Sequence, residues 1–598
     1  MSSFRNAIQI LDRSARITLL IVGVLLIGGT ALEILTVGLI FPLVKSISGG
    51  DALPNNGMFS QVVFLLAGRN TGFVPAAFAV LYFAVVLIKN IYNFGVSAYQ
   101  ERLFYRVSTE TSTRLLRSYL DSPWSMYLQR NSADMTNVAD SAAGAQLTNV
   151  LRSYLTIGTE LLVVAGLLAI LLAATPWPTL TAALVFGGGL LLAHRTVAAR
   201  IETLGRECTQ LAIERLRLFQ QAMVSAKEIK VLGRVPWLVA QYGDLRRREN
   251  LALRRVIVLQ SLPRYFVEPA LVGIMTAGIV VVTLASGNSK DTLAVLGLFA
   301  VAGLRLLPSL TRILAAAAAT MAGADPVARI GRDLALVTDC TGDGSIIGPL
   351  QHQIAVENLR FRYPGAEREV LRGLSLTLPK GSSTGLVGSS GAGKTTLADL
   401  LLALLEPSGG RVAVDGVDVR EDKIGWWRQI GYVPQTISLV DASLRENVAL
   451  GIEPGLIDDA RIWRVLALVQ LDDLANGLAK KLDTRIGERG VRLSGGERQR
   501  IGMARALYDG RTVLVLDEAT SALDALTESE IGEAIHRLHG QCTILVIAHR
   551  LSTIRNCDAV VMLADGEILD RGPFEALAAR CVPFKRLVDL GGLAPAAR

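Results

Sequence analysis

A glycine-rich segment that ends in a lysine and two threonines carries the clearest chemical signal in the chain. Residues 388–396 read Gly-Ser-Ser-Gly-Ala-Gly-Lys-Thr-Thr, between a strand-like run and a helix-like run. The spacing fits the phosphate-binding loop (P-loop) pattern at every fixed position, which disfavours a purely structural glycine turn. Its glycines let backbone N–H groups wrap a phosphate at a helix N-terminus, while Lys394 reaches the β- and γ-phosphates and Thr395 offers a hydroxyl to Mg²⁺. The nucleotide contacts predicted from this segment are Gly388, Ser389, Ser390, Gly391, Ala392, Gly393, Lys394, Thr395 and Thr396.

A pair of carboxylates at the end of an apolar run supplies the second half of the expected chemistry. Residues 513–518 read Val-Leu-Val-Leu-Asp-Glu, which predicts a buried parallel strand with Asp517 and Glu518 at its tip. An aspartate in this position can hold the magnesium shell, and the next carboxylate can orient or deprotonate an attacking water. Acidic residues often end strands, so the pair gains its meaning from the P-loop. Together they predict hydrolysis of a nucleoside triphosphate, with Lys394 and Glu518 as catalytic residues.

The elements that must position these residues alternate between strand-like and helix-like runs, as they do in α/β domains. We expect this domain to cover residues 353–598 and to follow a linker at 326–352, part of which is rich in glycine and polar residues. Residues 1–325 are then a separate domain. The five cysteines of the chain have no paired spacing that suggests zinc or redox chemistry.

The N-terminal domain has the composition of a membrane protein. Of the 598 residues in the chain, 51% are apolar and 19% are charged, whereas a water-soluble chain carries about a quarter charged residues. These numbers exclude disorder, collagen and a disulfide-built scaffold. The apolar runs predict six transmembrane helices, because most of them approach or exceed the roughly 20 residues that cross a bilayer. They lie at about 17–44, 73–95, 150–174, 177–193, 265–285 and 292–322.

The distribution of basic residues predicts the orientation of these helices. Arginines and lysines crowd the stretch 195–255, whereas the connections at 46–72, 174–178 and 286–291 contain only Arg69 and Lys290. By the positive-inside rule both termini face the cytoplasm. The net charge of +8 then reflects this rule rather than nucleic-acid binding.

Two features outside the bilayer are also predicted. Helical periodicity continues beyond the apolar runs, so the second to fifth spans should extend into the cytosol and turn around near 126–135 and 209–220. The amphipathic run at 58–67 is too short to span a membrane. It predicts either a helix at the outer membrane interface or a short helix packed in a loop.

Further motifs in the C-terminal domain resemble those of ATP-binding cassette (ABC) proteins. Residues 493–497, Leu-Ser-Gly-Gly-Glu, look like their signature motif, and matching positions elsewhere are Tyr363, Gln435 and His549. The resemblance implies that Tyr363 stacks on adenine of ATP, that Gln435 senses Mg²⁺ and the membrane domain, and that His549 contacts the γ-phosphate. It also implies that the signature closes on ATP held by a second copy of the P-loop, through Ser494, Gly495 and Gly496.

Six spans ahead of one cassette resemble the exporter class of ABC transporters. The implied fold is an α-helical membrane domain of exporter type joined to an α/β P-loop NTPase cassette, in a multi-pass protein of a bacterial-type cytoplasmic membrane. Since each signature must meet ATP on another cassette, two chains associate, and a homodimer has two intact sites. A heterodimer is an alternative, as is an ATP-gated channel on the same scaffold. A soluble role in DNA repair or translation is disfavoured by the spans.

Charged residues in the last two spans are candidates for substrate contacts, because charge is expensive inside a bilayer. Arg305 and Arg312 are seven residues apart, so they lie on one helix face. Arg264 precedes Glu268 by four residues in the fifth span. The alternative is that Arg264 pairs with Glu268 and that Arg264 and Arg312 extend to the inner membrane interface.

These segments, together with the stretch 33–42 (EILTVGLIFP), resemble the PglK-type flippases of lipid-linked oligosaccharides. The resemblance implies a polyprenyl-diphosphate-linked glycan as substrate, with Arg264, Arg305 and Arg312 binding its pyrophosphate. It also implies that 58–67 contacts the lipid tail. A multidrug or general lipid exporter is the alternative.

Overall fold

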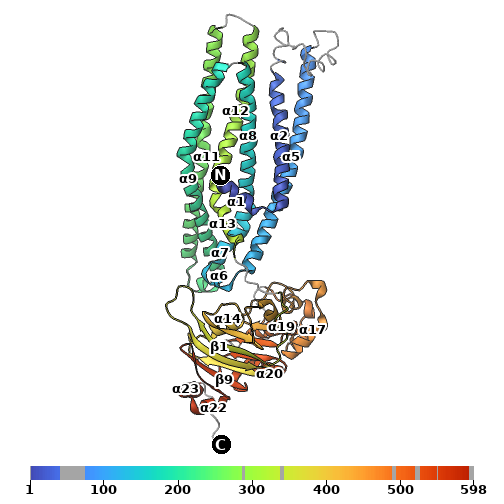
Figure 1. Cartoon of the computed structure of the whole chain (residues 1–598), viewed down its shortest axis with the longest axis vertical. Helices are drawn as coiled ribbons and strands as arrows, with labels where there is room; N and C mark the ends of the chain where they lie inside the picture. The colour runs from blue at the N-terminus through green and yellow to red at the C-terminus, as the bar shows by residue number, and fades with distance from the viewer. Residues whose placement is uncertain are drawn as a thin grey trace. The chain divides into compact units, whose positions relative to one another are not determined.

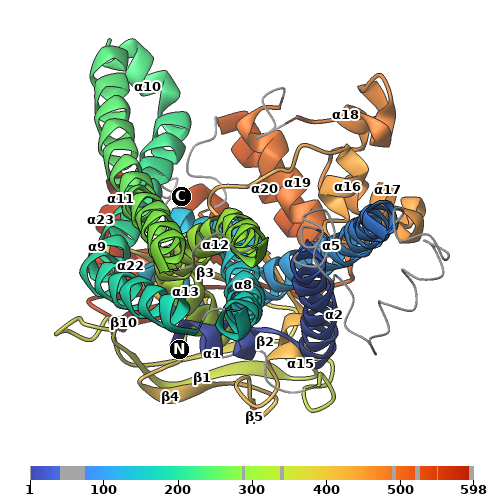
Figure 2. The same ribbon diagram turned by 90° about the horizontal axis from the view of Figure 1, so that it is seen from above.

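The computed structural model describes residues 2–40, 43, 74–174, 176–285, 290–336, 343–487, 493–518, 525–548 and 550–590. These residues form two units, which Figures 1 and 2 show as a set of long helices and a layered α/β body. The first unit comprises Met1–Ser122 with Gln129–Val337, and the second comprises Pro123–Leu128 with Thr338–Arg598.

Long helices dominate the first unit. Its principal members are α2 (Arg13–Gly38), α5 (Val74–Leu120), α8 (Leu147–Ala174), α9 (Pro176–Val224), α11 (Val235–Ala285) and α12 (Lys290–Ala322). Shorter segments of this unit join or precede them: α1 (Ser2–Ile10), α7 (Ser132–Thr136), the π-helix η2 (Asn137–Gln146), α10 (Ala226–Val231) and α13 (Ala324–Leu334). The short helix α6 (Trp124–Gln129) follows α5 in the chain, and most of it belongs to the second unit.

Four helical stretches within the described residues are long and apolar enough to cross a membrane. They are Arg13–Gly38, Val74–Leu120, Ser132–Leu172 and Leu304–Ala322. Their outer faces carry large apolar side chains such as Leu20 and Phe94, which are 71% and 77% exposed. A helix that is apolar on all sides belongs in a lipid environment. The runs predicted at 177–193 and 265–285 fall within the continuous helices α9 and α11, where most side chains lie outside the described part.

The predicted extensions are present as single long helices. α5, α9 and α11 contain 47, 49 and 51 residues, or roughly 70–75 Å each, which is more than twice the hydrocarbon thickness of a bilayer. The first turn falls at α6 and α7, near the predicted 126–135. The second prediction is wrong, because 209–220 remains helical and the chain turns at 225–234, where Gly233 has a φ of +65°. An ion pair of 2.7 Å between Arg215 and Glu249 instead holds α9 against α11 across this stretch.

Part of the predicted linker is a helix of the first unit. α13 buries Val327 and Ile330, and the carboxylate of Asp333 accepts hydrogen bonds from Tyr119 at 2.6 Å and from Arg130 at 2.8 Å. The segment from 343 onward is fastened to the second unit. There the Asp422 carboxylate accepts three backbone N–H bonds of 3.0–3.1 Å, from Gly344, Ile346 and Ile347.

The second unit contains two sheets. One is antiparallel in the order β2-β1-β4-β5, from β1 (Gln353–Phe361), β2 (Leu371–Pro379), β4 (Gly409–Val414) and β5 (Val417–Asp418). The other has the order β10-β9-β3-β8-β7-β6, and all its neighbours are parallel except β10 against β9. Its strands are β3 (Ser383–Gly388), β6 (Ile430–Val433), β7 (Val513–Asp517), β8 (Thr543–Ile547), β9 (Ala559–Ala564) and β10 (Glu567–Gly572).

Helices and short turns surround these sheets. They are α14 (Lys394–Leu401), α15 (Lys423–Trp427), α16 (Leu444–Val448), η3 (Pro454–Leu456), α17 (Asp459–Leu468), α18 (Asp472–Gly477), η4 (Lys481–Asp483), α19 (Gly495–Tyr508), α20 (Ala525–Leu538), α21 (Leu551–Ile554), α22 (Phe574–Arg580) and α23 (Val582–Leu590). Parallel strands buried on both faces read as continuous apolar runs, and every residue of β7 and β8 is buried. Because β3 and β7 both flank β8 in parallel, their carboxyl ends lie at the same edge of the sheet.

Candidate functional site

The P-loop runs from the end of β3 to the start of α14, as the sequence predicts. Gly391 and Gly393 have φ values of +82° and +102°, which L side chains rarely adopt. At Gly388 an added Cβ would lie 2.2 Å from the carbonyl oxygen of Leu563, so only glycine fits there. At Gly391, by contrast, an added Cβ would meet open space. The loop is therefore tightly wound, with room on one side for a ligand near the N-terminus of α14.

Lys394 is a buried cation folded onto this loop. Its side chain is only 6% exposed, and its Nζ donates hydrogen bonds of 2.9 Å and 3.0 Å to the carbonyls of Gly388 and Ser389. Burial lowers the pKa of Lys394, and the carboxylates of Glu518 and Asp517 oppose that effect. The ammonium thus donates to two neutral carbonyl oxygens. A phosphate oxygen, which is charged, would be a stronger acceptor for it than these carbonyls are.

Glu518 occupies an unusual backbone conformation at the tip of β7. Its φ is +48°, and its backbone N–H donates to the carbonyl of Ile547 at 2.9 Å. Non-glycine residues in this region are costly and gather at functional sites. Gln435 donates from Nε2 to Oε2 of Glu518 at 2.5 Å, and the carbonyl of Gln435 accepts from Gln499 of α19 at 2.9 Å. The structure therefore brings together the predicted Gln435 and Glu518.

Tyr363 also lies at the P-loop helix. Its hydroxyl is 3.1 Å from the hydroxyl of Thr396, and its ring packs edge-to-face against Phe361 with 4.9 Å between centroids. The ring is thus held beside the predicted phosphate site, where an aromatic face can stack on a base.

The signature residues begin a separate helix, α19. Ser494 is the N-cap: its hydroxyl accepts from the backbone of Glu497 at 3.2 Å, and the Glu497 carboxylate accepts from the backbone of Ser494 at 2.6 Å. Such a reciprocal cap fixes the direction of the helix. Gly495 and Gly496 form its first turn, where backbone N–H groups have no partner inside the helix. The predicted His549 lies outside the described residues, as do 488–492 and 519–524.

The donors near the P-loop fit a magnesium ion. Mg²⁺ takes oxygen ligands and is commonly held by one or two protein groups plus phosphates. Thr395 supplies a hydroxyl at the start of α14, Asp517 supplies a buried carboxylate at the end of β7, and Gln435 supplies an amide oxygen. Because β3 and β7 flank β8 in parallel, Lys394 after β3 and Asp517 at the end of β7 lie at the same edge of the sheet.

The segment that contains this site matches a known protein family. Residues 371–521 match the model of the family described as ABC transporter. This segment is therefore an ATP-binding domain of the ABC type. We call the second unit the cassette from here on.

Full-length relatives and a solved structure extend the likeness beyond the cassette. An ATP-dependent lipid A-core flippase of Ralstonia nicotianae is 29% identical over 83% of this chain and 84% of its own length. An Arabidopsis thaliana protein, ABC transporter B family member 21, is 38% identical over 39% of this chain. The matched part corresponds to 18% of the length of that relative. The structure of a bacterial Atm1-family ABC exporter with ATP bound has a TM-score of 0.83 and 21% identity, over 98% of this chain and 100% of the other. The chain therefore has the ABC exporter fold.

Asp399 is a titratable residue of the cassette that the sequence analysis missed. It lies on α14, five residues after Lys394. Burial, followed by the negative charge of Asp517, raises the pKa of Asp399 to about 6. The signal that indicates it is an acidic residue on a helix whose neighbours Leu397, Ala398, Leu400 and Leu401 are all buried.

Two of the three predicted substrate arginines are paired with carboxylates in the first unit. Arg305 of α12 forms an ion pair with Glu33 of α2, which also lies 3.9 Å from Nζ of Lys89. Arg312 forms an ion pair of 2.7 Å with Glu160 of α8. We call these five side chains the helix-bundle ion cluster. The side chain of Arg264 lies outside the described part of the structure.

The partners Glu33 and Glu160 were also missed as site residues. Both occur in apolar segments, and a lone acid in such a segment is the signal that indicates them. Their side chains are 13% and 12% exposed, so they are more deeply buried than the arginines they hold.

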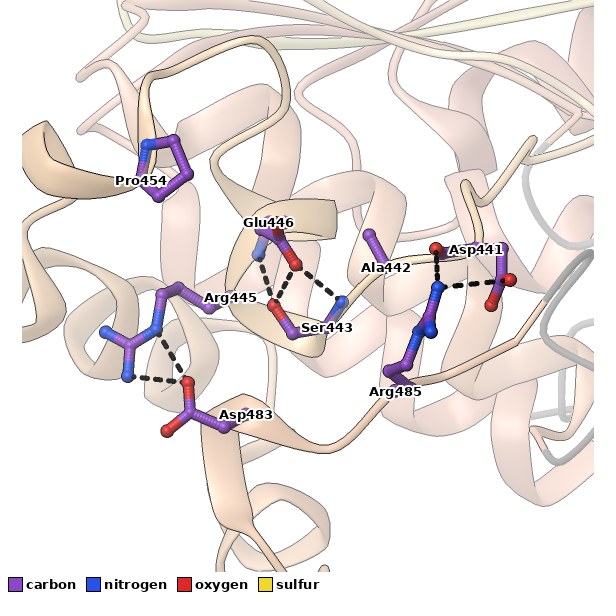
Figure 3. A pocket seen from close by; sticks show the side chains of 8 residues that line it. All are labelled: Asp441, Ala442, Ser443, Arg445, Glu446, Pro454, Asp483 and Arg485. Atoms are coloured by element: carbon purple, nitrogen blue, oxygen red, sulfur yellow. Dashed lines mark hydrogen bonds and ion pairs between the residues drawn. The ribbon is translucent and has the colours of Figure 1, made fainter.

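The cassette also has a hollow of about 500 Å³, shown in Figure 3. Arg445 is paired with Asp483 at 3.1 Å, and Arg485 donates to the carboxylate of Asp441 at 3.3 Å. Ser443 and Glu446 form the cap of α16. The lining residues are Asp441, Ala442, Ser443, Arg445, Glu446, Pro454, Asp483 and Arg485, none of which belongs to the predicted nucleotide site.

Replacing Asp399 with asparagine should stabilise the nucleotide-free protein at neutral pH. A carboxyl whose pKa is raised on folding destabilises the folded state at pH values above the folded pKa, here about 6, and has no effect below its ordinary value of 3.8. The Asp399→Asn variant should therefore melt roughly 2 °C higher at neutral pH and match the wild type near pH 4.

The matched control for this prediction is Asp558→Asn. Although burial alone raises its pKa, hydrogen bonds from Ser383 and His539 hold the pKa of Asp558 below its usual value, so this replacement should lower the melting temperature at neutral pH. Equal melting curves for Asp399→Asn and wild type at neutral pH would contradict the assignment of Asp399.

Proposed function

We propose that this chain is one half of an ATP-driven membrane transporter that flips a polyprenyl-diphosphate-linked oligosaccharide, or a similar glycolipid, across the cytoplasmic membrane. The observation that carries the substrate class is the pair of arginines on α12, held among apolar helices. A guanidinium offers a planar fork of donors that matches the oxygens of a diphosphate. It also keeps its charge at any cellular pH.

The charge of the helix-bundle ion cluster agrees with a dianionic headgroup. Three cations and two carboxylates leave one net positive charge in each chain. Two chains facing a common cavity then present two. A diphosphate that is esterified at both ends carries one negative charge on each phosphorus, so such a headgroup neutralises the pair of clusters.

Hydrolysis of ATP powers the transport in this proposal. Lys394 binds the β- and γ-phosphates, Tyr363 stacks on adenine, and Thr395, Gln435 and Asp517 hold Mg²⁺. When bound, Mg²⁺ neutralises the developing charge on the phosphate oxygens. Glu518 orients the attacking water and accepts its proton, and the 2.5 Å bond from Gln435 places that carboxylate. His549 contacts the γ-phosphate.

The proposed assembly is a homodimer in which each ATP lies between two cassettes. The exposed cap formed by Ser494 and Glu497 presents the first turn of α19, with Gly495 and Gly496, to a phosphate bound by the partner. The N-terminus of a helix is a favourable place for such an anion. Because the chain carries both halves of the site, a homodimer has two complete ones.

The proposed membrane topology follows from the basic residues already described. The cassette and both termini face the cytoplasm, and the helices span the inner membrane several times. A multidrug or general lipid exporter is the second candidate. The relative named ATP-dependent lipid A-core flippase, which matches along most of both chains, favours a lipid over a drug.

Replacing Glu518 with glutamine should separate ATP binding from hydrolysis. The amide keeps the size of the side chain but cannot accept the proton from water. We expect nucleotide affinity within severalfold of the wild type and turnover slower by at least about two to three orders of magnitude. Nucleotide binding and phosphate release measured on the purified variant check this, and normal turnover would remove Glu518 from the catalytic role.

Mixing two inactive variants should restore one site if ATP lies between the chains. Lys394→Ala removes a phosphate contact, and Ser494→Arg blocks the opposite face. Each pure variant should lose ATPase activity, whereas a mixed dimer has one site with wild-type residues at both positions and should recover part of the ATP-dependent closure. Cross-linking of co-expressed, differently tagged chains checks closure. An active pure variant would contradict the shared site.

Replacing both Arg305 and Arg312 with alanine should abolish flipping of a diphosphate-linked lipid in proteoliposomes. Basal ATPase activity should stay near normal, because the cassettes are untouched. Lysine at both positions should give an intermediate rate, since it keeps the charge but loses the planar fork. Translocation at the wild-type rate by the double alanine variant would favour the general exporter.

A further inference from the structure

The helix-bundle ion cluster contains its own anions, and this has consequences for how a ligand leaves. Each arginine already has a carboxylate partner, Glu33 for Arg305 and Glu160 for Arg312. An anionic headgroup that binds the arginines must displace these carboxylates. The same carboxylates are then available to take the arginines back.

Burial of the acids argues against a purely structural role for these ion pairs. Withdrawing two charges from water costs about as much as their attraction returns, so a buried ion pair is weak evidence for stability. Apolar side chains of similar size would hold the helices together at least as well. Charges inside an apolar helix bundle are therefore functional candidates by default.

Hydrogen bonding within the cluster and at the neighbouring Ser309 is also incomplete. Among the described residues, no hydrogen-bond partner lies near three buried atoms: Oε2 of Glu160, Nε of Arg305 and Oγ of Ser309. Ser309 is fully buried and lies four residues after Arg305 and three before Arg312, on the same helix face. Buried polar atoms in folded proteins nearly always have partners. A headgroup with phosphate oxygens supplies acceptors for two of these atoms.

Glu33 has a second partner that keeps it paired when Arg305 turns to a ligand. Nζ of Lys89 lies 3.9 Å from the carboxylate oxygen that Arg305 contacts. An acid that is left unpaired in an apolar environment is costly. With Lys89 beside it, Glu33 can give up Arg305 without that cost and remain in place to recover it.

We propose that Glu33 and Glu160 are release residues, internal carboxylates that compete with the diphosphate for Arg305 and Arg312 and so limit how tightly the headgroup is held. This inference rests on the proposed function. A transporter must let its cargo go, and an anion bound by bare arginines in a low-dielectric cavity would dissociate slowly. The intramolecular acids provide a replacement partner at high local concentration.

The inference predicts opposite changes in KM and in maximal rate. In the variant with both Glu33→Gln and Glu160→Gln, the charge that competes with the headgroup is gone while the size of each side chain is kept. The KM for a polyprenyl diphosphate-linked monosaccharide, measured by stimulation of ATPase activity in liposomes, should fall at least tenfold. The stimulated maximal rate should fall at least threefold, because release becomes slow.

Two control variants separate competition from general damage. Glu202→Gln makes the same chemical change at an exposed ion pair with Arg206 and should leave both parameters at wild-type values. The variant with Glu33→Asp and Glu160→Asp keeps the negative charges and should recover most of the wild-type KM and maximal rate. If the double glutamine variant does not accumulate, Glu160→Gln alone gives the same test, with a severalfold fall in KM, since its partner Arg312 is 44% exposed and keeps access to water.

The results distinguish failure of this inference from failure of the proposed function. If the lipid stimulates the wild type and Arg305→Ala abolishes the response, but the glutamine variants keep the wild-type KM or raise it, the release role is wrong and the substrate class stands. If the wild type does not respond to the diphosphate lipid, the proposed substrate is wrong and the release role fails with it.

Discussion

The parallel register of three neighbouring strands decides where chemistry can occur in the cassette. β3 and β7 pair with opposite sides of β8 in the same direction, so the chain leaves both strands at one edge of the sheet. Lys394 follows one strand and Asp517 ends the other, although 123 positions separate them in the sequence. Burial lowers the pKa of Lys394, and the nearby carboxylates of Glu518 and Asp517 oppose that effect.

The helical unit obeys a different constraint, because a charge among apolar membrane-type helices is costly. Its described arginines on α12 are neutralised by acids from α2 and α8, and the ion pairs link three helices. In the cassette, Lys394 lies near the carboxylates of Asp517 and Glu518 beside the predicted phosphate site. In the helical unit, carboxylates pair with the two arginines of α12. In both units, the proposed ligand binds to charged side chains that the fold already holds close together.

Much of the cassette could be predicted because its motifs are local. The P-loop and the apolar strand before Asp517 each occupy fewer than ten consecutive residues, and the structure has both elements at the predicted place. The contact between Gln435 and Glu518 joins residues 83 positions apart, and no sequence pattern indicates the left-handed backbone conformation of Glu518. Asp399 of α14 was missed for a related reason, since its raised pKa arises from burial and from Asp517 at the end of β7.

Prediction was weaker in the long helices, where the same apolar pattern continues for dozens of residues. The turn expected at 209–220 lies instead at 225–234, and within the expected stretch Arg215 of α9 pairs with Glu249 of α11. Arg305 and Arg312 were identified by their cost in a membrane. Their partners were not, because the sequence does not tell which helix faces α12.

The winding of the π-helix η2 affects the direction of one carboxylate of the helix-bundle ion cluster. η2 runs over Asn137–Gln146 and continues directly into α8, which carries Glu160. A π turn holds more residues than an α turn, and each residue of an α-helix advances the azimuth by about 100°. Rewinding part of η2 as α-helix would turn Glu160 about the axis of α8 relative to the segment before it. A change in winding would therefore alter the direction of that carboxylate relative to Arg312 even without any sliding of helices.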